Sequence, residues 1–133
     1  VLLFCLLFSF LYGVGSIFIL TWNASVLGVA IGNFIRTRLA DYAASAHLAK
    51  AAGYFHIFSL GLLRYAIHGI PEILSYFVGG LAGGIISIAV IRHDFGTKNF
   101  ERIVMDSSDL LIISLVLLVI AAFLEVYVTP LVF

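Results

Sequence analysis

The sequence has little charge and a single cysteine. Charged residues make up 11% of its 133 residues and hydrophobic residues 63%, whereas a soluble domain carries about 25% charged residues. Its mean hydropathy is +1.20, so the polar side chains are too few to cover a soluble fold, and we expect lipid to be its solvent. Lys plus Arg and Asp plus Glu number seven each, and this balance does not point to nucleic acid as a partner. With Cys5 alone, an intrachain disulfide and a cysteine-based metal site are excluded.

Linkers and repeats are also missing. Residues 1–133 contain no Pro-rich or Ser-rich stretch and no internal repeat, which predicts a single integral membrane domain. The chain begins at Val1, inside an apolar run and without the positively charged segment that opens a secretory signal. We expect Val1 to be a cut into a longer protein or the first ordered residue.

What the chain does have is long apolar runs, and these predict an all-α, polytopic transmembrane helix bundle of about five membrane segments. About 20 helical residues span a bilayer, and residues 1–35 carry no charged side chain. That run is too long for one crossing and short for two. We therefore expect a break at 21–25 (TWNAS), where Asn23 can cap a helix that begins at Ala24. Further apolar segments are expected at 54–67, 73–91 and 110–128.

The segment 64–77 (RYAIHGIPEILSYF) places ionisable groups among apolar residues. A helix break is predicted at His68–Pro71, because Gly69 suits a helix C-terminus and Pro71 a first helical turn. The helix that follows contains GGLAGG, whose paired glycines have the G-x-x-x-G spacing that lets another helix approach closely. These helix-packing glycines are Gly79, Gly80, Gly83 and Gly84.

Residues 92–109 are predicted to form the one solvated loop, and Ser108 or Asp109 to cap the last helix. Basic residues favour the cytoplasmic side of a membrane. With five segments, six of the seven basic residues can lie on the cytoplasmic side: Arg36, Arg38, Lys50, Arg92, Lys98 and Arg102. The exception is Arg64. The same orientation brings four polar residues to the outer ends of their helices: Asn23, His68, Glu72 and Glu125.

Intramembrane ionisable residues are functional candidates, but they also pair for structural reasons. In the structural interpretation His68 satisfies broken backbone, Glu72 caps a helix, and Glu125 reaches toward water or pairs with Arg64 or His68. In the functional interpretation His68, Glu72 and Glu125 are the candidate ligands of a divalent metal or members of a proton site, joined by Asn23. The metal motif H-E-x-x-H is absent. We predict that these polar residues meet in one buried cluster.

Three stretches in this order resemble the stage II sporulation protein M family, which is also described as a domain of unknown function. They are residues 21–32 (TWNASVLGVAIG), 68–84 (HGIPEILSYFVGGLAGG) and 121–130 (AAFLEVYVTP). The resemblance implies a polytopic α-helical membrane protein. In spore-forming bacteria, members of that family act with peptidoglycan-remodelling partners during engulfment of the forespore. Relatives also occur in bacteria and archaea that form no spores, and the family implies no enzymatic activity that transfers to these residues.

Three hypotheses for the function follow. The leading one is a non-enzymatic membrane scaffold or assembly protein, integral to the cell membrane and multi-pass. Its expected partners are the lipid bilayer, further copies of itself or other membrane proteins, and not nucleic acid. The second is a small transporter or permease subunit, for which broken helices beside buried charges are typical. The third is an intramembrane metal-dependent hydrolase, which requires a metal at His68, Glu72 and Glu125.

Overall fold

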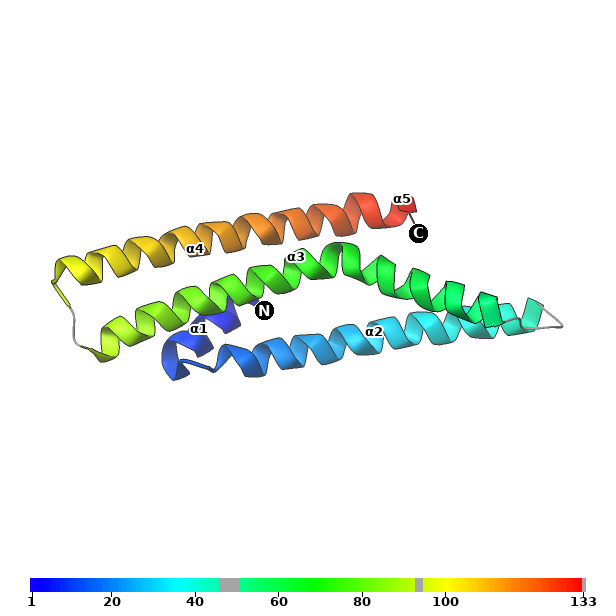
Figure 1. The fold of residues 1–133 in the computed structure, drawn as a ribbon, viewed down its shortest axis with the longest axis horizontal. Coiled ribbons are helices and arrows are strands. Elements are labelled where there is room, and N and C mark those ends of the chain that lie inside the picture. The colour runs from blue at the N-terminus through cyan, green and yellow to red at the C-terminus, as the bar shows by residue number, and fades with distance from the viewer. Residues whose placement is uncertain (46–50, 93–94, 133) are drawn as a thin grey trace.

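The computed structural model describes residues 1–45, 51–92 and 95–132. Its elements in chain order are α1 (Leu2–Tyr12), α2 (Ser16–Ser45), α3 (Ala51–Ile91), α4 (Lys98–Phe123), a π-helical turn (Leu124–Val128) and α5 (Thr129–Val132). No strand occurs in these described ranges, so the predicted all-α class is confirmed. Figure 1 shows α2, α3 and α4 side by side along the long axis of the molecule, with the short α1 beside α3.

The predicted number of membrane segments is wrong. Three helical stretches of the described chain are long and apolar enough to cross a membrane: Ser16–Ala43, Gly53–Ile91 and Lys98–Val132. The apolar α1 has 11 residues, too few for a crossing that needs about 20. Two of the five expected segments are lost because α1 is short and because residues 54–67 and 73–91 belong to one helix, α3.

The first helix break lies at Gly13 and not at Asn23. Gly13 has φ 64° and ψ −70°, and the Val14 N–H donates to the Tyr12 carbonyl at 2.7 Å. This is a γ-turn of the positive-φ kind, which a side chain would strain. The chain reverses here and continues as α2, which runs through Asn23 without interruption. The first helix therefore ends at the turn that contains Gly13 and Gly15. Asn23, the predicted cap, lies in the interior of α2.

The predicted break at His68–Pro71 is a bend within a continuous helix. Pro71 is the central residue of the 41 in α3, and Figure 1 shows α3 bending near its middle. Proline removes one hydrogen bond and its ring crowds the carbonyl four residues earlier, which here is Ile67. The neighbouring helices support α3 on both sides of the bend, so the helix continues and changes direction.

The last long helix begins earlier than predicted. The helix α4 starts at Lys98, one residue after Thr97, whose side chain accepts a hydrogen bond from the Phe100 N–H at 3.1 Å. Glu101 adds negative charge to the first turn, where it interacts favourably with the helix dipole and stabilises the helix. Most of the expected 92–109 loop is therefore helix, and Ser108 and Asp109 lie within it.

The continuous α3 also changes the predicted orientation. At about 1.5 Å per residue α3 is about 60 Å long, roughly twice the thickness of a bilayer core. Figure 1 places the C-terminal end of α2 and the N-terminal end of α4 at opposite ends of the molecule. Arg36 and Arg38 therefore lie far from Lys98 and Arg102. A single crossing by α3 puts the two groups on opposite sides of a membrane, contrary to the prediction. Lys50 lies outside the described residues.

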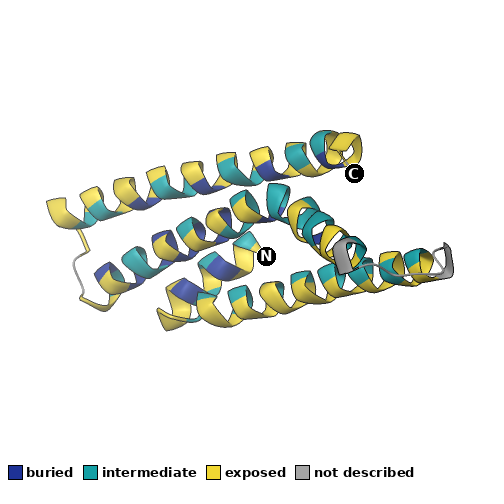
Figure 2. Cartoon of the chain, turned by 45° about the vertical axis from the view of Figure 1, so that its right-hand side comes forward, coloured by how far each residue is buried: buried dark blue, intermediate teal, exposed yellow. Residues whose placement is uncertain are grey.

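The contact between α3 and α4 is built from small side chains that recur every seven residues. The buried positions of these helices include two such series, Ser75, Ala82 and Ala89 on α3 and Ser107, Ser114 and Ala121 on α4. Small residues let two helix backbones approach closely, which is how helices pack in lipid. Figure 2 shows buried positions along α3, α4 and α1, whereas the described side chains of α2 are exposed or intermediate throughout.

The π-helical turn keeps this pattern in register near the C-terminus. Thr129 is buried although it follows Ala121 by eight residues and not seven. A π-helical turn holds one extra residue. The turn at Leu124–Val128 therefore rotates the end of the chain so that Thr129, and not Val128, continues the buried row toward His68.

Candidate functional site

Two residues of the predicted cluster, His68 and Glu72, lie near the middle of α3, and a third, Glu125, lies in the π-helical turn that follows α4. Glu72 and Tyr76 are one helical turn apart on α3, and the Tyr76 hydroxyl donates a hydrogen bond to Glu72 Oε1. Tyr76 is buried and Glu72 partly buried. A carboxylate in apolar surroundings is costly unless it has a hydrogen-bond partner, and Tyr76 supplies one. The sequence predicts instead that Glu72 caps a helix, and Tyr76 is not among the predicted cluster residues.

His68 lies one turn before Glu72 and contacts the chain end. Its Nδ1 atom is 3.5 Å from Thr129 Oγ1, and its ring centroid is 6.0 Å from that of Tyr65. The Thr129 hydroxyl donates its proton to the Leu124 carbonyl at 3.0 Å. His68 therefore connects α3 to the segment after the π-helical turn.

Glu125 belongs to the π-helical turn and is exposed. The hydrogen bond of Tyr76 joins it to Glu72 and not to Glu125 in the described part of the chain. The predicted buried pairing of Glu125 with Arg64 or His68 is not formed among the described side chains.

Arg64 and Asn23 lie away from this group. The Arg64 guanidinium is placed over the ring of Phe34 on α2, with Cζ 5.1 Å from the ring centroid. Asn23 is partly buried in α2, and no hydrogen bond joins it to His68, Glu72 or Glu125 in the described part of the chain. The structure thus brings together part of the predicted cluster, with Tyr76 and Thr129 as members that the prediction lacked.

The predicted metal ligands do not form a metal centre. Within the described ranges, no three side chains of His, Cys, Asp or Glu lie close enough together to hold an ion. His68, Glu72 and Glu125 are accordingly not gathered around a common point. What the described residues provide here is a hydrogen bond from Tyr76 to Glu72.

The glycines of α3 receive α1. A Cβ atom built on Gly83 would lie 2.5 Å from the Leu6 carbonyl oxygen, and one on Gly80 would lie 3.0 Å from Ser16 Oγ. Gly79 faces Leu2, and Gly84 faces Ser9. The Ser9 hydroxyl lies 2.5 Å from the Gly80 carbonyl oxygen and 2.8 Å from that of Gly13. The G-x-x-x-G surface is therefore occupied from within the chain by α1 and the start of α2.

A second polar contact ties α3 to α4. The Ser75 hydroxyl donates to the Ser114 carbonyl at 2.7 Å, and the Ser114 hydroxyl donates to the Ser75 carbonyl at 2.8 Å. Both serines are fully buried. This pair is not among the residues predicted from the sequence. Each serine stands in a seven-residue series with other small residues, Ala82 on α3 and Ser107 on α4, and this spacing could have identified it.

The comparison with protein families agrees with the resemblance. The model of one family, described as Stage II sporulation protein M, matches residues 1–130. Neither the search of curated proteins nor the search of solved structures found a match. The three long apolar helices and the family match both fit a membrane protein. With nearly the whole chain matched, the protein belongs to the Stage II sporulation protein M family.

Proposed function

We propose that this chain is a multi-pass protein of the cell membrane that acts as a non-enzymatic scaffold or assembly protein. The observation that carries the proposal is a set of hydrogen bonds from buried serines to neighbouring helices. Ser9, Ser75 and Ser114 each hydrogen-bond a backbone carbonyl of another helix. Interior polar groups engaged in this way fix the helices relative to one another. A fixed bundle suits a protein that presents a constant surface to partners.

The outer surface supports the same proposal. Large apolar side chains are exposed along every long helix, for example Val29 at 63%, Phe55 at 74% and Val119 at 70%. Such a surface is covered either by lipid or by other apolar protein surfaces. The partners of the scaffold would be other membrane proteins or further copies of this chain, within the bilayer.

In-cell photo-crosslinking tests the scaffold directly. A photoreactive residue at Val119, exposed on α4, should give a discrete adduct with another polypeptide, whereas the same residue at buried Ala82 should not. If exposed positions on α2, α3 and α4 all gave only lipid adducts, the proposal would be refuted.

A second candidate function, a small transporter, is favoured by one observation. Glu72 lies beside the central Pro71 of a bent helix and shares a proton-bearing contact with Tyr76. Ionisable groups at broken or bent helices are typical of transport pathways.

Proton flux into proteoliposomes, read with an enclosed pH-sensitive dye, separates the two functions. If the protein is a scaffold, proton flux should equal that of protein-free vesicles, and Glu72→Gln should not change it. If the protein is a transporter, proton flux should be faster than in protein-free vesicles, and Glu72→Gln should abolish the difference. The control variant Asp106→Asn, at an exposed position of α4, should keep the faster flux.

A further inference from the structure

Two arginines from different helices share one aromatic ring. The Cζ atom of Arg38 on α2 lies 5.5 Å from the centroid of the Phe34 ring, and that of Arg64 on α3 lies 5.1 Å from it. The ring of Tyr65 meets Phe34 edge-on at 6.2 Å. Cations are attracted to an aromatic face, but two cations held near one ring repel each other. An anion between them would relieve that repulsion.

The structure has a cavity where such an anion would bind. Both guanidinium groups line a space of about 550 Å³, together with the side chains of Asn33, Thr37 and Tyr65. Asn33 and Tyr65 can donate hydrogen bonds to an oxyanion, whereas the Thr37 hydroxyl already donates to the Asn33 carbonyl at 2.9 Å. Asp41 also lines the cavity. Its single negative charge against two positive charges leaves the lining with a net positive charge.

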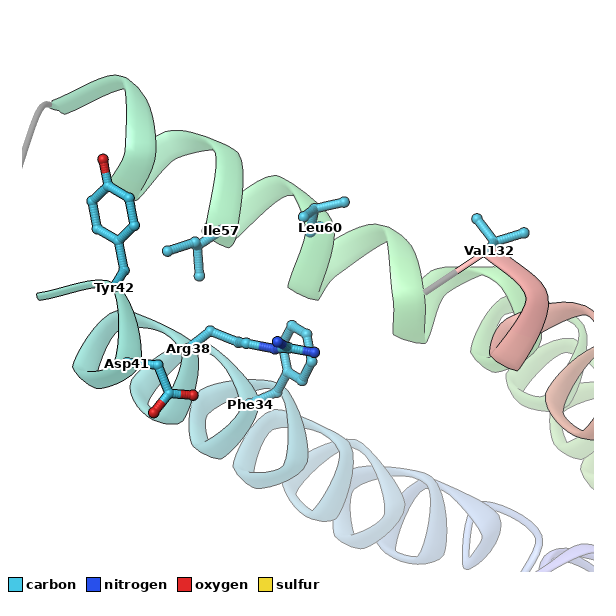
Figure 3. A pocket seen from close by; sticks show the side chains of 7 residues that line it. All are labelled: Phe34, Arg38, Asp41, Tyr42, Ile57, Leu60 and Val132. Carbon is cyan, nitrogen blue, oxygen red and sulfur yellow. The ribbon is translucent and has the colours of Figure 1, made fainter. Parts of the chain in front are cut away.

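An apolar cavity adjoins the polar one. It has a volume of about 590 Å³ and shares Phe34, Arg38 and Asp41 with the first. Figure 3 shows the Arg38 guanidinium beside the Phe34 ring, with Ile57 and Leu60 of α3 and Val132 of α5 along the apolar side. The combined site is therefore cationic in one part and apolar in the next.

The position of this site along α2 indicates the source of the ligand. Residues 1–35 carry no charged side chain, and the first charges of α2 are Arg36 and Arg38. The site thus lies where the uncharged part of α2 ends. In a helix that crosses a bilayer, this is the level of the lipid headgroups.

We propose that Arg38 and Arg64 bind the phosphate of an anionic phospholipid, whose acyl chain lies against Ile57, Leu60 and Val132. Paired guanidinium groups suit a phosphate because they donate several hydrogen bonds in a planar arrangement. The apolar neighbour cavity and the headgroup level favour a lipid over free phosphate. The site depends on the chain residing in a membrane and not on its acting as a scaffold.

The test is lipid binding by the purified full chain in detergent, followed by native mass spectrometry and by thermal stabilisation. The probes are phosphatidylglycerol, phosphatidylcholine and inorganic phosphate. We expect phosphatidylglycerol to bind and stabilise the protein, phosphatidylcholine to bind much more weakly, and phosphate not to displace phosphatidylglycerol. The double variant Arg38→Gln/Arg64→Gln should weaken phosphatidylglycerol binding by about 30-fold, because each basic side chain near anionic lipid contributes about fivefold in affinity.

A matched double variant, Arg36→Gln/Arg102→Gln, removes the same charge from exposed positions outside both cavities. It should retain the wild-type affinity. If Arg38→Gln/Arg64→Gln unfolds, Arg38→Lys/Arg64→Lys replaces it and should bind several-fold more weakly than wild type. Equal weakening by the matched variant, equal binding of the two lipids, or full displacement by phosphate would each overturn the proposal.

Discussion

The substitution Gly83→Ala tests the contact between α1 and α3. A Cβ atom at this position would lie 2.5 Å from the Leu6 carbonyl oxygen and 3.2 Å from Ser9 Cβ. The carbonyl belongs to the backbone of α1 and cannot rotate away. The helix α1 would therefore have to move outward by about 1 Å to reach an ordinary van der Waals separation.

Three effects set the size of the loss. Alanine is favoured over glycine inside a helix by about 1 kcal/mol, which opposes the destabilisation. Overpacking a close contact costs about 1–3 kcal/mol. Moving α1 also stretches the hydrogen bond between Ser9 and the Gly80 carbonyl, which is worth about 1 kcal/mol. The net expectation is a free energy of unfolding that is lower by about 1–3 kcal/mol.

The assay is reversible unfolding in detergent micelles, with Gly32→Ala as the control. A Cβ atom on Gly32 would meet no atom within 4 Å, so this variant should gain up to about 1 kcal/mol from helix propensity alone. If Gly83→Ala proved as stable as Gly32→Ala, α1 would not pack on α3 as described.

Three further predictions concern stability, each measured as the free energy of unfolding in the same micelles. Ser75→Ala and Ser114→Ala should each cost about 0.5–1.5 kcal/mol. The double variant should cost less than the sum of the two, because the two hydroxyls act as one reciprocal pair. Full additivity would contradict that pairing. Tyr76→Phe should cost about 1–3 kcal/mol by leaving the Glu72 carboxylate without its donor. Most of this loss should disappear in a Glu72→Ala background, which has no acceptor; an undiminished loss there would show that Tyr76 acts through something else. Gly13→Ala should cost about 1–3 kcal/mol because its φ of 64° with ψ −70° strains a side chain, whereas Gly28→Ala, in open space, should not.

The class of the protein could be predicted from its sequence because composition determines it. A chain with 11% charge has to hide its backbone polar groups in helices if lipid surrounds it. The glycines at 79–84 were also recognisable, since their spacing has a direct steric meaning. The segment that covers them was not, because α1 was expected to be part of a longer helix that ends near Asn23.

The errors in the helix boundaries have one physical origin. A helix boundary depends on the neighbouring helices as well as on local sequence signals. Pro71 breaks an isolated helix, yet α3 continues through it because α2 contacts α3 before the proline, at Tyr65, and α4 contacts it after the proline, at Ser75. Asn23 is a good cap in isolation but lies inside α2, because the turn at Gly13 has already reversed the chain.

The side-chain partners were harder to predict for a different reason. Glu72 bonds to Tyr76 on its own helix, and Arg64 turns to Phe34 on α2. The contact of His68 with Thr129 depends on a π-helical turn that shifts the register by one residue. No periodic pattern in the sequence signals that turn, so facing residues near the C-terminus could not be aligned.

The most direct test of the account is the side of the membrane on which the two ends of α3 lie. In a Cys5→Ala background, single cysteines at Ala43 on α2 and Lys98 on α4 can be labelled in sealed vesicles with a membrane-impermeant maleimide; both native residues are exposed. One continuous α3 that crosses once predicts that the two positions are labelled from opposite sides. Labelling of both positions from the same side would contradict the single crossing and restore a chain that turns back at Pro71.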